Sequence, residues 1–198
     1  MSWALMKFIL MIIWGWEMNK LFVFVEGDDD VMFIDNILLN HFQQDIVIIP
    51  ITYQKKHNIK IIKQIKKINS NNEMEYIFLS DLDSHSYSSI EDRKKKRIKE
   101  FHHEEYEDLD PNKIFIVVEE IESWYLAGID SSLESFKDFD IPENTENFTK
   151  EQLDEMILNS DFLSKIDFFK EVSQVYDIHL AMQRNKSFRY FFKELNLL

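Results

Sequence analysis

The chain has 198 residues, of which 45% are hydrophobic, and this is enough for one domain with a substantial core, alone or with an appendage. It contains no cysteine, which excludes disulfides, zinc–thiolate sites and a cysteine nucleophile and fits a reducing cytoplasm. The formal net charge of −13 argues against a protein that coats nucleic acid nonspecifically.

Residues 1–17 are almost entirely apolar. They are shorter than the roughly 20 residues of a membrane-spanning helix, and they lack the basic start and the cleavage site of a signal peptide. The favoured interpretations are that Met18 is the true first residue, or that the stretch is an added helix on an apolar surface. A membrane anchor is the remaining alternative. The predicted organisation is an N-terminal extension (1–17), an α/β core (18–130) and a helical segment packed on the core (131–198).

A buried strand is predicted at Leu21 to Val25, where five apolar residues follow one another without polar alternation. Glu26 and then Asp28 to Asp30 come directly after it. Carboxylates crowded at the end of a buried strand repel one another, and burial raises their pKa values. A divalent cation would relieve both costs, so we expect a metal site at this strand end. Asp28 and Asp29 are predicted to cap the helix that follows.

The next elements alternate between helix and strand. Residues 31–42 have the apolar spacing of an amphipathic helix, and residues 46–51 form a second apolar strand, with Pro50 at a sheet edge or turn. Residues 57–68 form a second helix with an isoleucine stripe facing inward. Its outer stripe consists of Lys56, Lys60, Lys63 and Lys67. A solvated face is the favoured interpretation of these lysines, and a ridge that contacts phosphates is the alternative.

A second acidic cluster follows the third strand, which is predicted at Tyr76 to Leu79. Asp81 and Asp83 are two residues apart, so an extended backbone would point both side chains to one side. Two carboxylates on one side suit Mg²⁺, which prefers oxygen ligands. A turn or cap is the alternative role, but the buried strand before the pair favours the metal.

A third acidic cluster follows the fourth strand. Residues 88–108 are predicted to form a long exposed helix with the basic run RKKKRIK, and residues 114–118 form the strand. If the backbone stays extended beyond it, Glu120 and Glu122 share a face.

Alternation of strands and helices predicts parallel strands with right-handed crossovers. The three acidic strand ends then converge on one edge of one sheet. From residue 131 onward, short amphipathic helices are predicted at 149–158, with a capping box, and at 162–176 and 187–195.

With these clusters, the chain resembles the Toprim superfamily, and in particular small stand-alone Toprim-like proteins related to the nuclease half of the OLD family. The resemblance covers roughly residues 20 to 198. Its matching residues are Glu26-Gly27 with Asp30, the Asp81–Asp83 pair, Glu120 to Trp124, and Asn185 to Phe188.

The resemblance implies an α/β fold with a mainly parallel, Toprim-like (Rossmann-like) sheet flanked by helices and a C-terminal helical appendage. It implies a nuclease that binds one or two Mg²⁺ or Mn²⁺ ions and hydrolyses DNA or RNA, with phage defence as a role by family analogy. The residues carried over are Glu26 as metal ligand or general base, Asp81 and Asp83 as catalytic metal ligands, and Asp30, Glu120 and Glu122 as support for a second metal.

The chain departs from OLD-type nucleases, which carry an ATPase domain. It has no GxxxxGK[ST] motif and only three glycines, so a separate partner would supply any ATP hydrolysis. A non-catalytic module that binds nucleic acid or protein is the main alternative, and a phosphatase-like or nucleotide-hydrolysing enzyme is a weaker one. Primase or topoisomerase activity is least favoured. The expected location is cytoplasmic, without membrane attachment, and the sequence leaves the oligomeric state open.

Overall fold

The structure is a computed structural model of the chain, and it describes residues 20–41, 46–54, 56–82 and 89–195. The predictions for residues 1–17 and for Asp83 therefore lie outside the described residues. No helix within the described part of the chain is long and apolar enough to cross a membrane.

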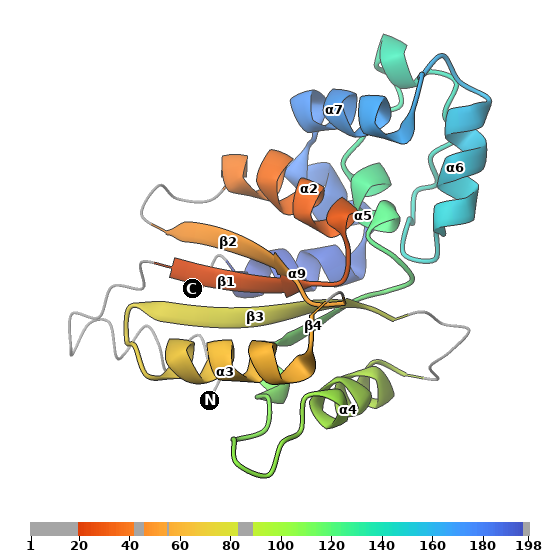
Figure 1. Cartoon of the computed structure of the whole chain (residues 1–198). Coiled ribbons are helices and arrows are strands. Elements are labelled where there is room, and N and C mark those ends of the chain that lie inside the picture. The colour runs from red at the N-terminus through yellow and green to blue at the C-terminus, as the bar shows by residue number, and fades with distance from the viewer. Residues whose placement is uncertain (1–19, 42–45, 55, 83–88, 196–198) are drawn as a thin grey trace.

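The centre of the fold is a four-stranded sheet in which every pairing is parallel, with the strand order β2-β1-β3-β4 (Figure 1). Its strands are β1 (Lys20–Val25), β2 (Val47–Thr52), β3 (Met74–Asp81) and β4 (Ile114–Val117). The predicted α/β class with a parallel, Rossmann-like sheet is confirmed. Pro50 lies on the edge strand β2, where its missing N–H removes no bond from the interior of the sheet.

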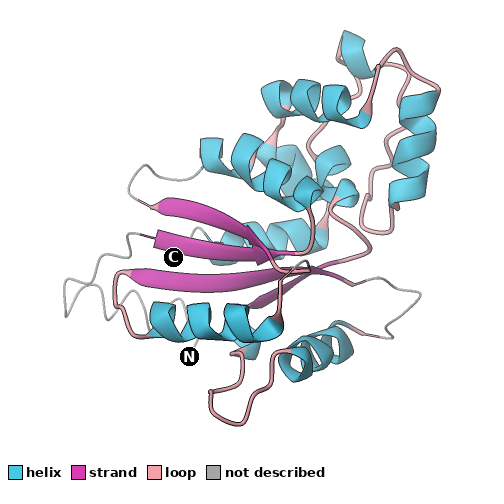
Figure 2. Cartoon of the chain, in the orientation of Figure 1, coloured by secondary structure: helices cyan, strands magenta, loops and turns pink. Residues whose placement is uncertain are grey.

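Helices cover both faces of this sheet (Figure 2). On one face lie α3 (Asn58–Asn69) and α4 (Ile90–Glu100). On the other face, α2 (Asp28–Asn36) contacts β2 and α9 (Lys186–Leu195) contacts β4. The remaining helices pack against these two or one another in the same apolar cluster, namely α5 (Glu122–Ala127), α6 (Lys150–Leu158), α7 (Lys165–Val175) and α8 (Ile178–Arg184). Short 3-10 helices occur at Leu38–His41, Pro111–Lys113 and Glu134–Phe136.

Alternate residues of the buried strands face two separate apolar clusters. In β1, Val23 and Val25 belong to the larger cluster, whereas Phe24 stacks on Phe78 in the smaller one. This is the arrangement expected for a strand buried on both faces. The isoleucine stripe of α3 is buried in the smaller cluster, as its spacing predicts.

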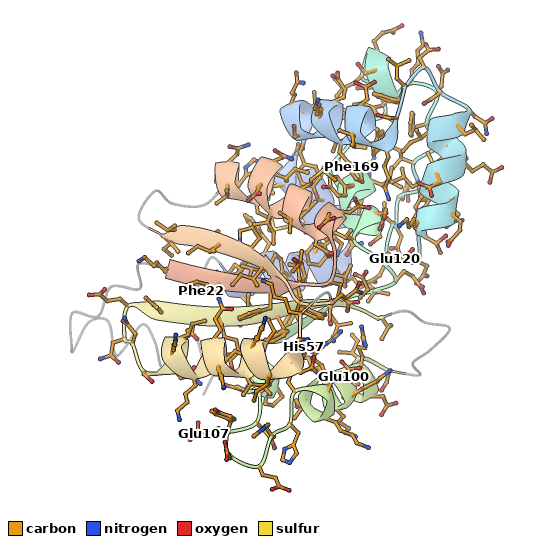
Figure 3. The ribbon with its side chains drawn as sticks, viewed as in Figure 1. Phe22, His57, Glu100, Glu107, Glu120 and Phe169 are labelled. Atoms are coloured by element: carbon orange, nitrogen blue, oxygen red, sulfur yellow. The ribbon has the colours of Figure 1, made fainter. Side chains whose placement is uncertain are left out.

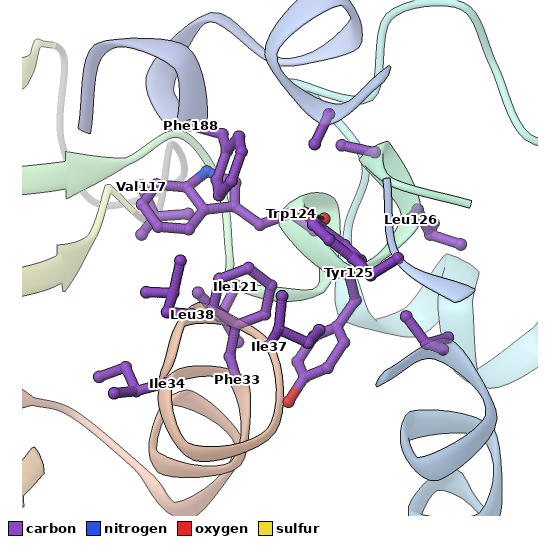
Figure 4. Close-up of a cluster of buried hydrophobic side chains, with 14 of the residues drawn as sticks. Phe33, Ile34, Ile37, Leu38, Val117, Ile121, Trp124, Tyr125, Leu126 and Phe188 are labelled. Atoms are coloured by element: carbon purple, nitrogen blue, oxygen red, sulfur yellow. Dashed lines mark hydrogen bonds between the residues drawn. The ribbon is translucent and has the colours of Figure 1, made fainter. Parts of the chain in front are cut away.

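Trp124 lies at the middle of the larger cluster, between α2 and α9 (Figure 4). It is fully buried, and its indole N–H donates to Ser187 Oγ at 2.9 Å. Tyr176 donates its hydroxyl to the Trp124 carbonyl oxygen at 2.6 Å. These bonds fasten α5 to the C-terminal helices, since buried polar groups need partners.

Several predicted helices differ in extent from the observed ones. Residues 31–42 were expected to be helical, but α2 starts at Asp28 and ends at Asn36. Both α4 and α7 are shorter than predicted. Helix α8 was not predicted from the sequence, although Asp177 caps its start by accepting hydrogen bonds from His179 N and Leu180 N. The predicted capping box of α6 is confirmed, with Thr149 at the N-cap.

Candidate functional site

The acidic residues that follow β1, β3 and β4 lie at one edge of the sheet. Strands β1 and β3 are neighbours, and the chain continues from β1 to β2 on one side and from β3 to β4 on the other. This is a topological switch point, where open α/β sheets bind their ligands. Glu26 directly follows β1, and Asp81 is the last residue of β3. The two therefore lie side by side at that point.

Glu26 is held as an anion by several donors. Its Oε1 accepts hydrogen bonds from Arg93 Nη2 at 2.6 Å, Arg97 Nη2 at 2.7 Å and Ser80 Oγ at 2.9 Å. Its Oε2 accepts one from Gln54 Nε2 at 3.0 Å. Burial alone would raise the pKa of Glu26, but the charges of Arg97 and Arg93 outweigh it and hold this pKa below its usual value.

The helix α4 that carries these two arginines was predicted to be exposed, but only one side of it is, because both arginines are buried. Arg93 and Arg97 are only 6% and 5% exposed. Arg93 Nε donates to the Asp81 carbonyl oxygen at 2.6 Å, and the Arg97 guanidinium lies 4.5 Å from the centre of the Tyr53 ring. Two arginines four residues apart share a helix face, and here that face turns toward the sheet. The sequence signal for this burial was the presence of arginine within a run of lysines, since the planar guanidinium group of arginine suits ion pairs with buried carboxylates.

Asp30 lies in the first turn of α2 and is 4% exposed. Its Oδ2 accepts a hydrogen bond from Gly27 N at 2.8 Å, so Asp30 itself reaches back to cap the helix, a role predicted for Asp28 and Asp29. Burial raises the pKa of Asp30 to about 7, and the neighbouring carboxylates, led by Glu26, add to the increase.

Asp81 carries the least satisfied carboxylate of the described site. Its Oδ1 is buried and has no hydrogen-bond partner. Burial raises the pKa of Asp81 well above its usual value, and the charges of Asp30, Glu26 and Glu122 raise it further. A buried polar atom without a partner costs about 1–3 kcal/mol, and more for a charged group.

Lys165, at the start of α7, was not identified from the sequence. Its Nζ lies 2.6 Å from Glu122 Oε1 and 2.9 Å from Asp29 Oδ2. Burial alone would lower the pKa of Lys165, but the bonds to Glu122 and Asp29 raise it. Glu122 is 3% exposed, so this ammonium neutralises a buried charge. Lys165 is far from the acidic clusters in sequence, and only the packing of α7 brings it to them.

The extended backbone on which a shared face for Glu120 and Glu122 was predicted is absent from this described segment. The backbone turns at Glu119, which has a φ of 59°, and α5 begins at Glu122. Glu120 Oε2 accepts a hydrogen bond from Lys150 N at 2.8 Å and so binds the start of α6 (Figure 3). Burial raises the pKa of Glu120, and the charge of Glu122 adds to this.

The carboxylates at this edge therefore differ in how they are neutralised. Glu26 has two arginines and Glu122 has Lys165, whereas Asp30 and Asp81 have no cationic side chain among their described partners. No group of three or more His, Asp or Glu side chains in the described ranges has the geometry of a metal site. The donor chemistry still suits a hard divalent cation, which would satisfy the Asp81 oxygen.

A cavity of about 270 Å³ lies between α3 and the loop that follows α4, away from the acidic edge. Ile62, Ile65 and Phe101 line it together with Lys66 and Tyr106, and Lys66 Nζ lies 5.1 Å from the centre of the Tyr106 ring. None of its lining residues belongs to the acidic clusters.

No curated protein matches this chain. Among solved structures, the chain is similar to the C-terminal region of the Burkholderia pseudomallei OLD protein, with a TM-score of 0.47 and 14% sequence identity. That similarity covers 89% of this chain and 98% of the other chain. The model of the family described as Domain of unknown function (DUF4276) matches residues 25–196. Because this match spans most of the sequence, the chain belongs to the DUF4276 family.

Proposed function

We propose that the protein is a Toprim-type nuclease that hydrolyses phosphodiester bonds in DNA or RNA with Mg²⁺ or Mn²⁺. The observation that carries the proposal is the buried, unpartnered Oδ1 of Asp81, next to the buried Asp30 at the switch point of the sheet. Two carboxylates with raised pKa values and no cationic partner in the described part of the chain match a site for a divalent cation.

In this proposal, Asp81 and Asp30 hold the first ion, with Asp83 as a further ligand. Glu26 is kept charged and oriented by its arginines and would serve as a metal ligand or general base. Glu122 supports a second ion, as does Glu120. A bound ion supplies an activated water and stabilises the leaving oxygen.

Lys165 is proposed to stabilise negative charge on the substrate. Its ammonium lies between Asp29 and Glu122 at the acidic edge. An ion bound by Glu122 would take the place of Lys165 as the partner of that carboxylate and leave the ammonium available to a phosphate oxygen. Fixed charges aimed at the developing charge of a transition state are a large part of catalysis.

The test is cleavage of plasmid DNA and of RNA by the purified protein with Mg²⁺ or Mn²⁺. Asp81→Asn keeps the shape of the side chain but removes its charge, and it should abolish cleavage. Asp138→Asn is the matched control, because Asp138 is exposed and outside the acidic edge. Equal cleavage by Asp81→Asn and wild type would refute the assignment.

A second candidate is a non-catalytic module that binds nucleic acid or a protein. The full set of donors around Glu26 and the ion pair of Glu122 favour it, because these carboxylates are already neutralised by the chain itself. Calorimetry distinguishes the two candidates. Heat of Mn²⁺ binding that disappears in Asp81→Asn supports the nuclease, and no binding in the wild type supports the module.

The proposed setting is a cytoplasmic defence against phage. Because the sequence has no GxxxxGK[ST] motif, an ATPase that controls the reaction would lie outside it, as a partner protein. Bacteria that express the wild-type protein should survive phage challenge better than bacteria that express Asp81→Asn. Equal survival would remove the defence role but leave the chemistry to be judged by the cleavage assay.

A further inference from the structure

The basic residues of this acidic chain are concentrated in two short stretches. Residues 46–72 contain six lysines and no acidic residue, and residues 90–100 contain six basic and three acidic residues. Together they hold twelve of the 23 basic residues and three of the 36 acidic ones. Positive charge is therefore local on a molecule that otherwise repels anions.

The fold brings both stretches to one face of the sheet, where α3 and α4 lie (Figure 1). Asn58 Nδ2 donates to the Glu100 carbonyl oxygen at 2.7 Å, which joins the start of α3 to the end of α4. Figure 3 shows His57 and Glu100 at this junction. The isoleucines of α3 and the two arginines of α4 point inward, so the lysines point outward. We define the basic face as the exposed side chains of Lys56, Lys60, Lys63, Lys67, Lys95 and Lys99.

The lysines of the basic face have no counter-charges among the residues that the structure describes. None of the six forms an ion pair with any residue that the structure describes, whereas Lys113 and Lys165 both do. Like charges three or four residues apart on a helix repel each other, so the array destabilises the free protein slightly. An anionic partner would offset that repulsion.

The basic face begins where the acidic edge ends. Gln54, two residues before Lys56, donates to Glu26 Oε2 at 3.0 Å. In α4, Arg93 contacts both Glu26 and the Asp81 carbonyl oxygen, while Lys95 lies on the outer side of the same helix. The basic face and the acidic edge therefore adjoin through Gln54 and Arg93.

We propose that the basic face binds the sugar-phosphate backbone of a nucleic acid and delivers it to the acidic edge. This inference rests on the proposed nuclease function, because it names the surface that holds the substrate. Lys60 and Lys67 are separated by about 10 Å along the axis of α3, roughly the length of three phosphates of one DNA strand. A polymer, and not a small phosphate ester, can occupy the whole array.

An anionic membrane is a worse match for this face. Helices that bind membrane surfaces pair their lysines with exposed apolar side chains that enter the lipid. Among the large hydrophobic side chains exposed in the described ranges, only Ile90 belongs to α3 or α4, and it is 39% exposed. The face therefore provides charge without an apolar anchor.

The test measures binding without metal, so that it does not depend on cleavage. Fluorescence anisotropy of labelled DNA and RNA oligonucleotides is recorded in EDTA over a range of salt concentrations. We expect binding whose logarithm falls linearly with the logarithm of salt concentration. The triple variant Lys60→Glu, Lys63→Glu and Lys67→Glu should lower the salt slope by about 3 for duplex DNA and by about 2 for single strands. The DNA and RNA arms identify which nucleic acid is preferred.

The matched control reverses the charge of three exposed lysines outside the basic face, and so changes the net charge by the same amount as the triple variant of α3. It consists of Lys137→Glu, Lys170→Glu and Lys193→Glu. A second variant, Lys95→Glu with Lys99→Glu, tests the other helix of the face and keeps the test valid if the first triple fails to fold. Loss of binding in the α3 and α4 variants but not in the control supports the proposal.

Equal losses in all three variants would overturn the proposal, because net charge alone would then explain them. Binding of phosphatidylserine vesicles without binding of oligonucleotides would also overturn it. Failure of the nuclease function looks different, because oligonucleotides would still bind in EDTA while Mn²⁺ would produce no cleavage. Conversely, unchanged KM for cleavage in the triple variant would reject the basic face and retain the nuclease.

Discussion

Replacing Asp30 by asparagine should stabilise the metal-free protein above neutral pH. Asp30 is buried among carboxylates, and its pKa is raised from 3.8 to about 7. Between these two values the folded protein keeps a proton that the unfolded chain releases, so stability falls as pH rises through this window. Asparagine keeps the shape and the acceptor for the Gly27 N–H but cannot become charged.

The magnitude follows from the size of the pKa shift. Each pKa unit corresponds to about 1.4 kcal/mol, so the ionised Asp30 lowers the free energy of unfolding by about 4 kcal/mol at pH 8. At pH 5 the same calculation gives a decrease of about 1.6 kcal/mol in the free energy of unfolding, because the folded protein is then protonated at Asp30. The charge of Asp30 also raises the pKa of Asp81, so the substitution acts on both carboxyl groups.

The assay is urea unfolding in EDTA at both pH values, with Asp138→Asn as the exposed control. The increase in the free energy of unfolding caused by Asp30→Asn should be larger at pH 8 than at pH 5. The slope of this free energy with urea concentration should stay unchanged. Adding Mn²⁺ should then stabilise the wild type more than the variant, because the ion neutralises a charge that only the wild type has. A variant that is less stable than the wild type at pH 8, or a gain that does not shrink on acidification, would refute the reasoning.

Three further changes test other parts of the structure. Arg97→Met should lower the free energy of unfolding by about 3 kcal/mol, since it leaves Glu26 with one buried arginine; a urea midpoint equal to that of the wild type would contradict this. Lys165→Met should cost about 2 kcal/mol in EDTA and less with Mn²⁺, which supplies the missing positive charge; an equal cost in both buffers would argue against an ion there. Gly128→Ala should cost about 1–3 kcal/mol, seen as a lower melting temperature, because the added Cβ would lie 2.5 Å from the Tyr176 ring.

The parts of the fold that could be predicted are those determined by local pattern. The run from Leu21 to Val25 has no polar alternation, and it forms a strand buried on both faces. The stripe of isoleucines in α3 fixes its inward side by spacing alone. The convergence of the acidic strand ends at one edge follows from parallel pairing, which the alternation of strands and helices already implies.

The parts that could not be predicted depend on contacts between distant residues. A run of basic residues has no apolar stripe to show its inward side, so the burial of Arg93 and Arg97 depends on Glu26 at another strand end. The backbone turn that ends the extended conformation before Glu120 occurs at Glu119, a glutamate with positive φ, where no glycine signals it. Lys165 reaches the site only because α7 packs against α2.

The hydrogen bond between Trp124 and Ser187 has a consequence for folding during synthesis on the ribosome, because it joins the helix that carries Glu122 to a residue near the C-terminus. Glu122 and Trp124 lie on the same short helix, and the indole of Trp124 finds its hydrogen-bond partner in α9. A nascent chain that has not yet reached residue 187 lacks this partner and also lacks Phe188 and Phe191, which pack on the indole. The helix that presents Glu122 is therefore secured late, so that an active centre built on it would mature only after most of the polypeptide has been made.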